Sequence, residues 1–456
     1  MSDPSLESRL PQRPIDRLLQ PFQAWAGHQL AGAVLLMAAA VVAVAWANSP
    51  WGDAYHHWLH MPVRAGFGSF TLEKTLHHWI NDGLMAVFFF LVGLEIKREV
   101  LGGELSTRRK AALPAIAALG GMLVPAALYL AFNPEGPGRA GWGVPMATDI
   151  AFALGVLALL GDRVPLGLKV FLTALAIVDD IGAVLVIAVF YTAGVSLTSL
   201  AVGFVVFGLA LVANRLQVRN WLVYFALGLI VWFAFLQSGV HATIAALLMA
   251  FAIPGRSRFG REDLAQRLRG KLDELDRALR EGDEHARQRA ADRIELLLEG
   301  SGSPAGKLEH ALHPLVALVI LPLFALANAG VVPGGDLGSA LGDSVTLGVV
   351  VGLFVGKQVG VFLFTWLAVR LGLADLPDRV SWRQVYGVSA LAGIGFTMAL
   401  FIAGLAFAEP AGLEAAKLGI LAASVLSGLV GWSFLRFGCA PDCPPPEPAV
   451  DPVDKR

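Results

Sequence analysis

Charged residues are scarce in this sequence of 456 residues, and that scarcity limits the kind of protein it can be. Lys, Arg, Asp and Glu make up 16% of the chain, whereas hydrophobic residues make up 56% and the mean hydropathy is +0.63. An ordinary soluble domain of this length is less apolar. The composition therefore predicts an integral membrane protein that lies in a lipid bilayer. The net charge of -1 excludes no partner, because the distribution of charge matters more than its sum in such a chain.

Cysteine is also rare: the chain has two, Cys439 and Cys443, both in the polar segment CAPDCPPPEP. Two cysteines in one short tail exclude a disulfide framework. A CxxxC pair without companion His or Cys ligands is a weak metal signal, so we interpret both as reduced thiols. No small-residue cleavage site follows the first apolar segment, which indicates a retained helix rather than a secretory signal. The sequence contains no phosphate-binding loop, and we also expect no nucleic-acid partner and no cofactor.

Long apolar segments are what the sequence does contain, although several are short or include Gly and Pro. They lie at residues 29–48, 77–95, 111–132, 142–160, 166–191, 197–214, 220–236, 239–253, 310–331, 345–369, 384–408 and 413–435. We therefore predict an all-α polytopic membrane protein with about 12 transmembrane helices. The implied organisation is a cytoplasmic tail (1–28), transmembrane helices 1–8 (29–254), a charged cytoplasmic helical insert (255–307), transmembrane helices 9–12 (308–436) and a polar, Pro-rich cytoplasmic tail (437–456).

The positive charges indicate how these helices are oriented. If the N-terminus is inside, the outer loops hold only four of the 35 Lys and Arg residues: Arg64, Lys74, Arg139 and Lys417. Most of the others fall on the inner side, in agreement with the positive-inside rule. Both termini are therefore expected in the cytoplasm.

The insert differs sharply from the rest of the chain, with 12 Lys or Arg and 11 Asp or Glu between Gly255 and Lys307. Apolar residues recur at spacings of three and four on both sides of Glu281–Asp283, first at Leu264, Leu268, Leu272, Leu275 and Leu279, then at Ala286, Ala290, Ile294 and Leu297. This spacing predicts two amphipathic helices joined by a turn. The hairpin is either a solvated surface element or a docking or regulatory element on the inner face.

Three ionisable residues lie at mid-depth in apolar segments. Asp179 and Asp180, in the stretch VDDIGAV, are the only charges between Val170 and Phe190. Lys357 is the central residue of 345–369, too far from either end for its side chain to reach the interface. A charge at mid-depth costs about 2.5 kcal/mol or more and usually faces an interior cavity. These residues are therefore candidates for a functional site.

Two apolar segments contain helix-breaking residues at a similar depth. Thr148 and Asp149 follow Pro145 in the fourth segment, and Gly393 and Gly395 precede Thr397 in the eleventh. Interrupted backbone in a membrane is tolerated only where it is buried in protein or lines a polar cavity. Because the two segments hold the same place in the triplets three to five and ten to twelve, they indicate the central site of a transporter.

This set of groups suits the exchange of two cations. Carboxylates, a hydroxyl and freed carbonyls can replace the water around Na⁺, and the same carboxylates bind protons. Competition for one site that faces one side of the membrane at a time produces obligatory exchange. A Lys–Asp pair that only fixes helix packing is an alternative, and the glycines taken alone could simply allow close helix approach.

Two other classes of protein use similar groups. An intramembrane aspartyl protease needs two buried carboxylates on separate helices, and its GxGD pattern is absent. A passive cation channel needs a continuous pore rather than a buried lysine beside the ion.

Several motifs follow one another along the chain: FLVGLEIKRE, TDIAFALGVLALLG, ALAIVDDIGAVLVIA, SGVHAT, LEHALHP, FALANAGV, FVGKQVGV and GIGFTM. Together they resemble the NhaA family of sodium/proton antiporters, and the resemblance implies a fold with inverted repeats. The resemblance covers roughly residues 28–437 except the insert. It implies a bacterial inner-membrane transporter that expels Na⁺ or Li⁺ electrogenically in exchange for incoming protons, without a nucleotide.

The resemblance also implies roles for individual residues. Asp180 and Asp179 bind the cation and carry protons, with Thr148 close by. Asp149 and Lys357 compensate the charged ends of half-helices, and Lys357 is also a partner for Asp179.

Activation at alkaline pH is implied through a cytoplasmic cluster, whose matching positions are Glu95, Arg98, His241, Glu309, His310 and His313. Histidines with carboxylate neighbours titrate between about pH 5 and 8. His310 and His313 share a helix face, so a metal site is an alternative to a titrating pair there. The insert ends just before Glu309, where it could shift the pH response. The segment His60–Thr75 resembles the hairpin that joins two protomers, which implies a homodimer.

Overall fold

The computed structural model describes residues 29–67, 70–192, 194–257, 261–332, 340–377 and 380–438. Most of them are helical. The N-terminal tail and both cysteines lie outside the described residues, so the expectations for those segments remain expectations.

Internal contacts divide the chain into two compact units. Unit 1 comprises the described parts of Met1–Leu59, Ala112–Asp179 and Ala317–Arg456. Unit 2 comprises those of His60–Ala111 and Asp180–Val316. One of the four borders falls between Asp179 and Asp180, two consecutive residues of helix α9 (Leu166–Phe190).

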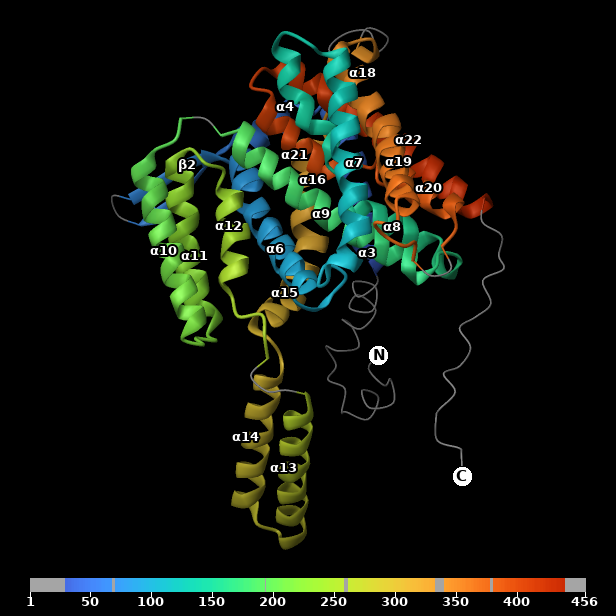
Figure 1. The fold of residues 1–456 in the computed structure, drawn as a ribbon. Coiled ribbons are helices and arrows are strands. Elements are labelled where there is room, and N and C mark those ends of the chain that lie inside the picture. Colours follow the sequence, from blue (N-terminus) through green and yellow to red (C-terminus); the bar gives the residue numbers. More distant parts are fainter. Residues whose placement is uncertain are drawn as a thin grey trace. The chain divides into compact units, whose positions relative to one another are not determined.

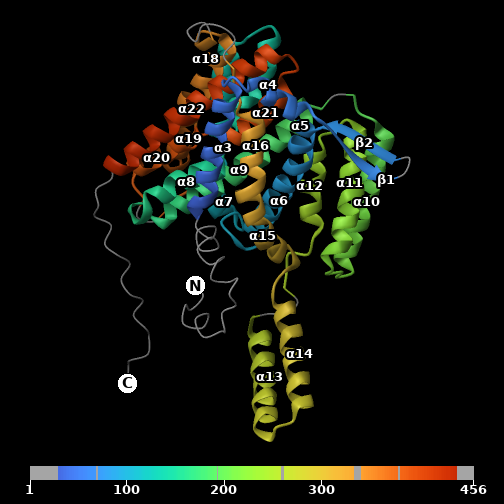
Figure 2. The same ribbon diagram turned by 180° about the vertical axis from the view of Figure 1, so that it is seen from behind.

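Unit 1 contains both interrupted segments. Its other helical elements are α3 (Gln29–Ala47), α4 (Gly52–His60), α7 (Arg108–Phe132), the 3₁₀ turn η3 (Gly161–Arg163), α16 (Leu321–Asn328), α18 (Ser344–Val350), the π-helical turn η5 (Val351–Gly356), α19 (Lys357–Arg370) and α22 (Pro410–Phe437). The interrupted segments are η2 (Pro137–Met146) with α8 (Ile150–Leu159), and α20 (Trp382–Leu391) with α21 (Phe396–Ala406). Helix α20 packs against both α19 and α22 (Figures 1 and 2).

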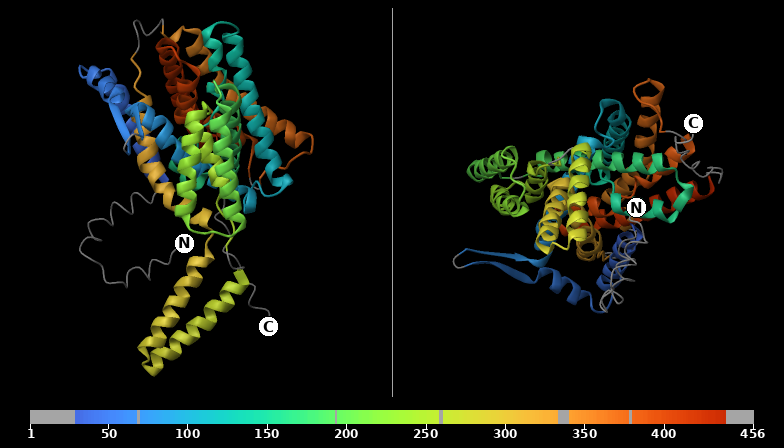
Figure 3. Two further views of the ribbon diagram at one scale, coloured as in Figure 1. Left: turned by 90° about the vertical axis from the view of Figure 1, so that its left-hand side faces the viewer. Right: turned by 90° about the horizontal axis from the view of Figure 1, so that it is seen from below.

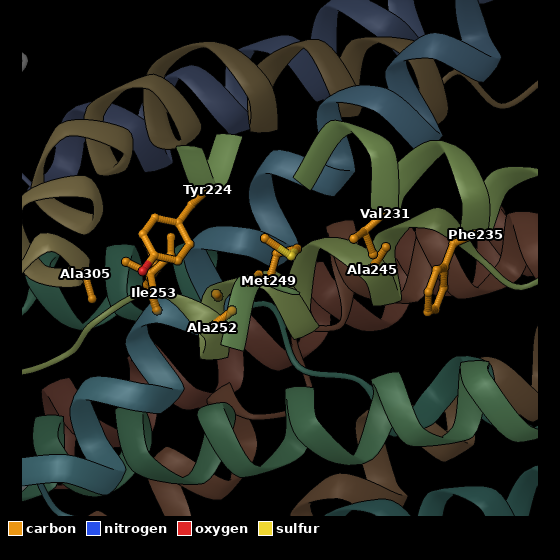
Figure 4. Packing of buried hydrophobic residues seen from close by; sticks show 11 residues of the cluster. Tyr224, Val231, Phe235, Ala245, Met249, Ala252, Ile253 and Ala305 are labelled. Carbon is orange, nitrogen blue, oxygen red and sulfur yellow. The ribbon is translucent and has the colours of Figure 1, made fainter. Parts of the chain in front are cut away.

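Unit 2 is built around helices that pack side by side. Its elements are β1 (Pro62–Phe67), β2 (Phe70–Thr75), α5 (Leu76–His78), the π-helical turn η1 (Trp79–Leu84), α6 (Met85–Gly102), α10 (Leu197–Arg215), α11 (Trp221–Ser238), α12 (Ala242–Ala252), α13 (Arg261–Glu281), α14 (Glu284–Ser301) and α15 (Pro304–Leu315). The π-helical turn η4 (Val316–Ile320) spans the border to unit 1. Apolar side chains of α10, α11 and α12, including Val231, Phe235 and Met249, form a buried cluster with Leu94 of α6 (Figure 4).

Strands β1 and β2 form an antiparallel hairpin that runs in register from Pro62 opposite Thr75 to Phe67 opposite Phe70. It directly precedes α5 (Figure 2). The hairpin lies within His60–Thr75, the segment in which the family resemblance implied a hairpin. Among the described residues it is the only sheet, and the fold class is all-α as predicted.

Helices occupy all twelve predicted apolar segments, but the predicted number of spans is not confirmed. In the described part of the chain, nine helices are long and apolar enough to cross a membrane, and the two bent pairs raise the number to 11. The eighth segment contains only α12, with 11 residues. This helix is shorter than the roughly 20 residues that cross a bilayer core.

The insert folds into the helix pair α13 and α14. Gly282 joins them with φ of +69°, a conformation that glycine adopts without steric cost. The Asp283 carboxylate caps α14 by accepting hydrogen bonds from the amides of Ala286 and His285, both at 3.0 Å, and these bonds lower the pKa of Asp283. Figure 3 shows the pair extending beyond α10, α11 and α12 of the same unit.

Candidate functional site

Two breaks in helices of unit 1 form the centre of the candidate site. The pair η2 and α8 bends by 43° around Ala147–Asp149, and the pair α20 and α21 bends by 44° around Ala392–Gly395. Pro145 just before the first break lacks an N–H, and Gly393 and Gly395 lie within the second. Both breaks therefore occur where the sequence predicted them.

The two breaks are hydrogen-bonded directly to each other. The amide of Asp149 donates to the carbonyl of Ile394 at 2.7 Å, and Thr148 Oγ1 donates to the carbonyl of Ala392 at 2.8 Å. Interrupting a helix leaves peptide groups without partners, which is costly away from water. Here each break supplies partners for the other.

The Asp149 carboxylate caps two half-helices at once. Oδ1 accepts the amide of Phe152 in the first turn of α8 at 2.9 Å. Oδ2 accepts both the amide of Thr397, at 3.0 Å, and its hydroxyl, at 2.5 Å, in the first turn of α21. The N-terminal end of a helix carries partial positive charge. A single buried anion therefore compensates the N-terminal ends of both half-helices.

Ser424 of α22 completes this arrangement. Its Oγ accepts the amide of Phe396, the first residue of α21, at 3.2 Å. Sequence reasoning noted Thr397 only as part of the break, and it missed Ser424. A serine in an apolar helix gives no signal of such a contact, because its hydroxyl usually bonds within its own helix.

Lys357 and Asp179 form a fully buried ion pair in unit 1. Nζ lies 2.6 Å from Asp179 Oδ2, and neither side chain is exposed. Asp179 Oδ1 is also buried and accepts no hydrogen bond from any described residue. Thr148 lies near enough to interact with the same carboxyl group. One oxygen of this carboxylate is thus held by the lysine, and the group as a whole lies beside Thr148.

The neighbouring carboxylate belongs to Asp180, the next residue of α9, whose side chain is 1% exposed. Consecutive helical residues point about 100° apart, so the two carboxylates face different directions. The structure thus keeps both acids away from solvent, as expected for ionisable groups in a membrane segment.

Part of the predicted pH-sensing cluster comes together in unit 2. Arg98 forms an ion pair with Glu309 and a second one with Glu99 at 3.1 Å. Glu95 lies close enough to Arg98 and Glu309 to interact with both charges. The neighbouring Lys97 anchors α6 by donating to the carbonyls of Phe251 and Ile253 at the end of α12. Sequence reasoning did not single out that lysine.

The three histidines of the predicted cluster are less closely associated. His310 and His313 follow Glu309 on α15, and both are exposed. His241 directly precedes the first residue of α12, and its Nε2 lies 2.9 Å from the carbonyl oxygen of Tyr191. Within the described ranges, no group of three or more His, Cys, Asp or Glu residues is arranged to hold a metal ion.

Two broken membrane helices held together at their breaks, with a buried acid and lysine in the same unit, define a secondary transporter. The family model described as Na+/H+ antiporter 1 matches residues 23–435. The chain is also 53% identical over 429 residues to the Na(+)/H(+) antiporter NhaA of Oleidesulfovibrio alaskensis, covering 93% of this chain and 95% of the relative. It is 48% identical to the antiporter of the same name in Koribacter versatilis, covering 96% of both chains.

These matches span almost the whole protein, and the chain belongs to the Na+/H+ antiporter 1 family. It is therefore a multi-pass membrane transporter and not an enzyme.

Proposed function

We propose that this sodium/proton antiporter expels Na⁺ or Li⁺ from a bacterial cell in exchange for external protons, across the inner membrane and with net movement of charge. The observation that carries the proposal is the buried Asp179 carboxylate. One of its oxygens is bound by Lys357 at 2.6 Å, and the other accepts no hydrogen bond from any described residue. Such a carboxylate binds either a proton or a cation, but not both at once.

The proposed cation ligands are Asp180, Asp179 and Thr148. Thr148 Oγ1 uses its hydrogen in the bond to the Ala392 carbonyl, so its lone pairs remain available to a metal ion. Na⁺ is a hard cation that prefers oxygen ligands of these kinds. When the cation leaves, protons take its place on the two acids.

Coupling follows from three groups that compete for the Asp179 carboxylate. A cation bound there displaces the Lys357 ammonium, because two positive charges on one buried carboxylate repel each other. A proton neutralises the acid and also weakens the pair. If only the loaded site changes the side that it faces, protons must move in whenever a cation moves out. Exchange is electrogenic when more than one proton replaces each Na⁺.

The breaks provide a rigid frame for this cycle. The Asp149 carboxylate is fully committed to Phe152 and Thr397, so it serves charge compensation rather than cation binding. We assign Lys357 to the proton and cation cycle through its contact with Asp179.

Regulation by pH is proposed for the acidic and basic residues at the end of α6 and the start of α15. The ion pair of Arg98 with the buried Glu309 joins these two helices, and Glu95 adds a further carboxylate. The exposed His310 and His313 on α15, and His241 at the N-terminal end of α12, complete the proposed cluster. Protonation would change the net charge on α15, which connects directly to the insert.

The remaining features concern topology and assembly. We propose that both termini and the insert are cytoplasmic, and that the β1–β2 hairpin joins two protomers into a homodimer. Ion pairing of Arg64 with Glu73 at 3.0 Å across the hairpin stabilises its register.

The function is tested with inside-out vesicles that respiration has acidified. Addition of Na⁺ or Li⁺ should collapse the proton gradient, and Asp180→Asn should abolish the response. The matched control is Asp263→Asn, which makes the same chemical change on the exposed surface of α13, where the side chain is 48% exposed. A well-energised vesicle without a Na⁺-dependent response, or a fully active Asp180→Asn variant, would contradict the proposal.

A further inference from the structure

The insert helices α13 and α14 pack against each other along one seam. Ala278 of α13 and Ala290 of α14 are buried in this seam. On one side of it, Arg293 forms an ion pair with Glu274 at 3.7 Å. This contact sets the register of the two antiparallel helices, because residues counted from it in opposite directions lie at the same height.

Apolar side chains line the other side of the seam. Leu272 and Leu279 are 52% and 56% exposed, and Leu298 is 52% exposed. Ala265 and Ala291 are exposed as well, and they lie seven residues before Leu272 and Leu298. Residues seven apart lie on the same face of a helix. These five residues are called the leucine face of the insert.

Both helices contribute to the same face. Leu279 and Ala291 each follow a buried seam residue, Ala278 and Ala290, by one position. In an antiparallel pair, corresponding positions of the two helices lie on the same side of the seam. The ion pair between Arg293 and Glu274 lies on the opposite side.

A contiguous apolar face is unusual on a segment as charged as the insert. Single exposed leucines are normal, whereas a contiguous apolar patch marks a docking surface. The insert carries 12 Lys or Arg and 11 Asp or Glu, so it is nearly neutral. A helix that lies on an anionic lipid surface has a strongly basic polar face. The charge balance therefore favours a protein partner over the bilayer.

A second copy of this chain fits the leucine face by symmetry. Two copies that cross the membrane in the same direction carry their inserts on the same side, and a two-fold axis along the seam brings the two leucine faces together. Helix α13 of one copy then lies opposite α14 of the other. In the register above, Leu298 of the second copy falls between Ala265 and Leu272. Ala291 of the second copy likewise falls between Leu272 and Leu279.

The charges at the rim of the leucine face are complementary in the same arrangement. Arg269 and Glu295 are both exposed and border this face on their helices. Their heights along the pair differ by three positions, which is about 4.5 Å. The two-fold axis places Arg269 of each copy beside Glu295 of the other, and opposite charges fix the register of an interface. Asp276, a neighbouring acid, is already paired with Arg280 at 2.9 Å.

We propose that the leucine face of the insert packs against the same face of a second copy, so that two inserts form a four-helix bundle on the cytoplasmic side. This inference rests on the proposed homodimer and adds a contact to it, separate from the β1–β2 hairpin and from the ion site. The bundle buries the leucines and pairs Arg269 with Glu295 between the copies.

The first test measures the dissociation constant of the dimer. Full-length copies fused to donor or acceptor fluorescent proteins are diluted in detergent micelles, and energy transfer reports their association. The double substitution Leu272→Glu and Leu279→Glu should raise the dissociation constant about tenfold or more, because it places charges inside the bundle. The matched control is Leu296→Glu, since Leu296 is 66% exposed and lies two residues from Leu298, about 160° away around the helix. This control should leave the dissociation constant unchanged.

Charge reversal tests the identity of the partner. Arg269→Glu and Glu295→Arg each place like charges at both rim contacts of their own dimer. A mixed dimer of the two variants has two pairs of opposite charges instead. Mixed dimers should therefore exceed the fraction of about one half that random pairing of equal amounts gives.

Equal dissociation constants for the leucine variant and its control would overturn the inference and assign the leucine face to lipid or to another protein. Random pairing of the two charge variants would overturn it as well. All variants should retain Na⁺-dependent exchange in vesicles, which shows that they fold. A protein that stays monomeric at every concentration would refute the homodimer and this inference together. Absence of exchange in an intact dimer would refute the proposed ion exchange alone.

Discussion

The hydrogen bonds between Asp149 and Thr397 should make these residues energetically coupled. Thr397→Val removes the hydroxyl that donates to Asp149 Oδ2 at 2.5 Å and keeps the shape of the side chain. Asp149→Asn keeps the shape of the carboxylate and removes its charge. Both residues are almost completely buried, so water cannot replace the lost partners.

The magnitudes follow from the number of donors that surround the carboxylate. A buried hydrogen bond to a charged group contributes about 1.5–3 kcal/mol, so Thr397→Val should lower the free energy of unfolding by about 2 kcal/mol. Asp149 accepts bonds from three donors. In Asp149→Asn, the amide NH₂ group must face at least one of these donors, and the charge that compensates two helix ends is lost. Asp149→Asn should therefore lower the free energy of unfolding by about 3 kcal/mol.

The two substitutions together should cost less than the sum of their separate effects. Valine at 397 removes one of the donors that the Asn amide would face, so a coupling of about 1–2 kcal/mol is expected. The free energy of unfolding can be measured by SDS titration in mixed micelles, with circular dichroism to follow helicity. Thr365→Val is the control, because this buried hydroxyl donates to the neutral carbonyl of Val361 at 2.7 Å. Strictly additive effects, or a loss in Thr397→Val no larger than in the control, would refute the reasoning.

Two further predictions concern segments that lie outside the apolar helices. Burial raises the pKa of Tyr55 to about 12, above its ordinary value of 10.0. The buried neutral hydroxyl therefore contributes fully to the stability of the fold below about pH 10, and this contribution is lost as the pH rises towards about 12. Thermal denaturation from pH 9 to 12 should show a shallower decline for Tyr55→Phe than for the unaltered protein, and parallel curves would count against this role. Deletion of residues 260–300 should leave exchange intact and shift its pH profile. A short linker can replace the deleted residues, because the amide of Ala305 donates to the carbonyl of Pro254 at 3.2 Å. An unchanged profile would discard the regulatory role of the insert.

Features that depend on local sequence were predictable. Proline and glycine at fixed positions indicated both breaks, because they remove a donor or a side chain from the helix. The spacing of leucines and Gly282 likewise indicated two helices and the turn in the insert. The isolated charges of Asp179, Asp180 and Lys357 identified buried positions, because a charge in an apolar segment is costly anywhere else.

Features that depend on contacts between distant segments were not predictable in the same way. The partners Asp149 and Thr397 are separated by 248 residues, and no periodicity in the sequence links them. The role of Ser424 and the π-helical turn before Lys357 depend on how α22 and α7 pack. The number of spans was also uncertain, because hydropathy alone does not separate the 11-residue α12 from a full span.

The most direct test of a shared site is equilibrium binding of ²²Na⁺ to the purified protein as the pH is lowered from about 8.5 to about 5.5. Bound Na⁺ should fall as protons occupy Asp179 and Asp180. Binding that stays constant across this range would contradict a shared site for the two ions.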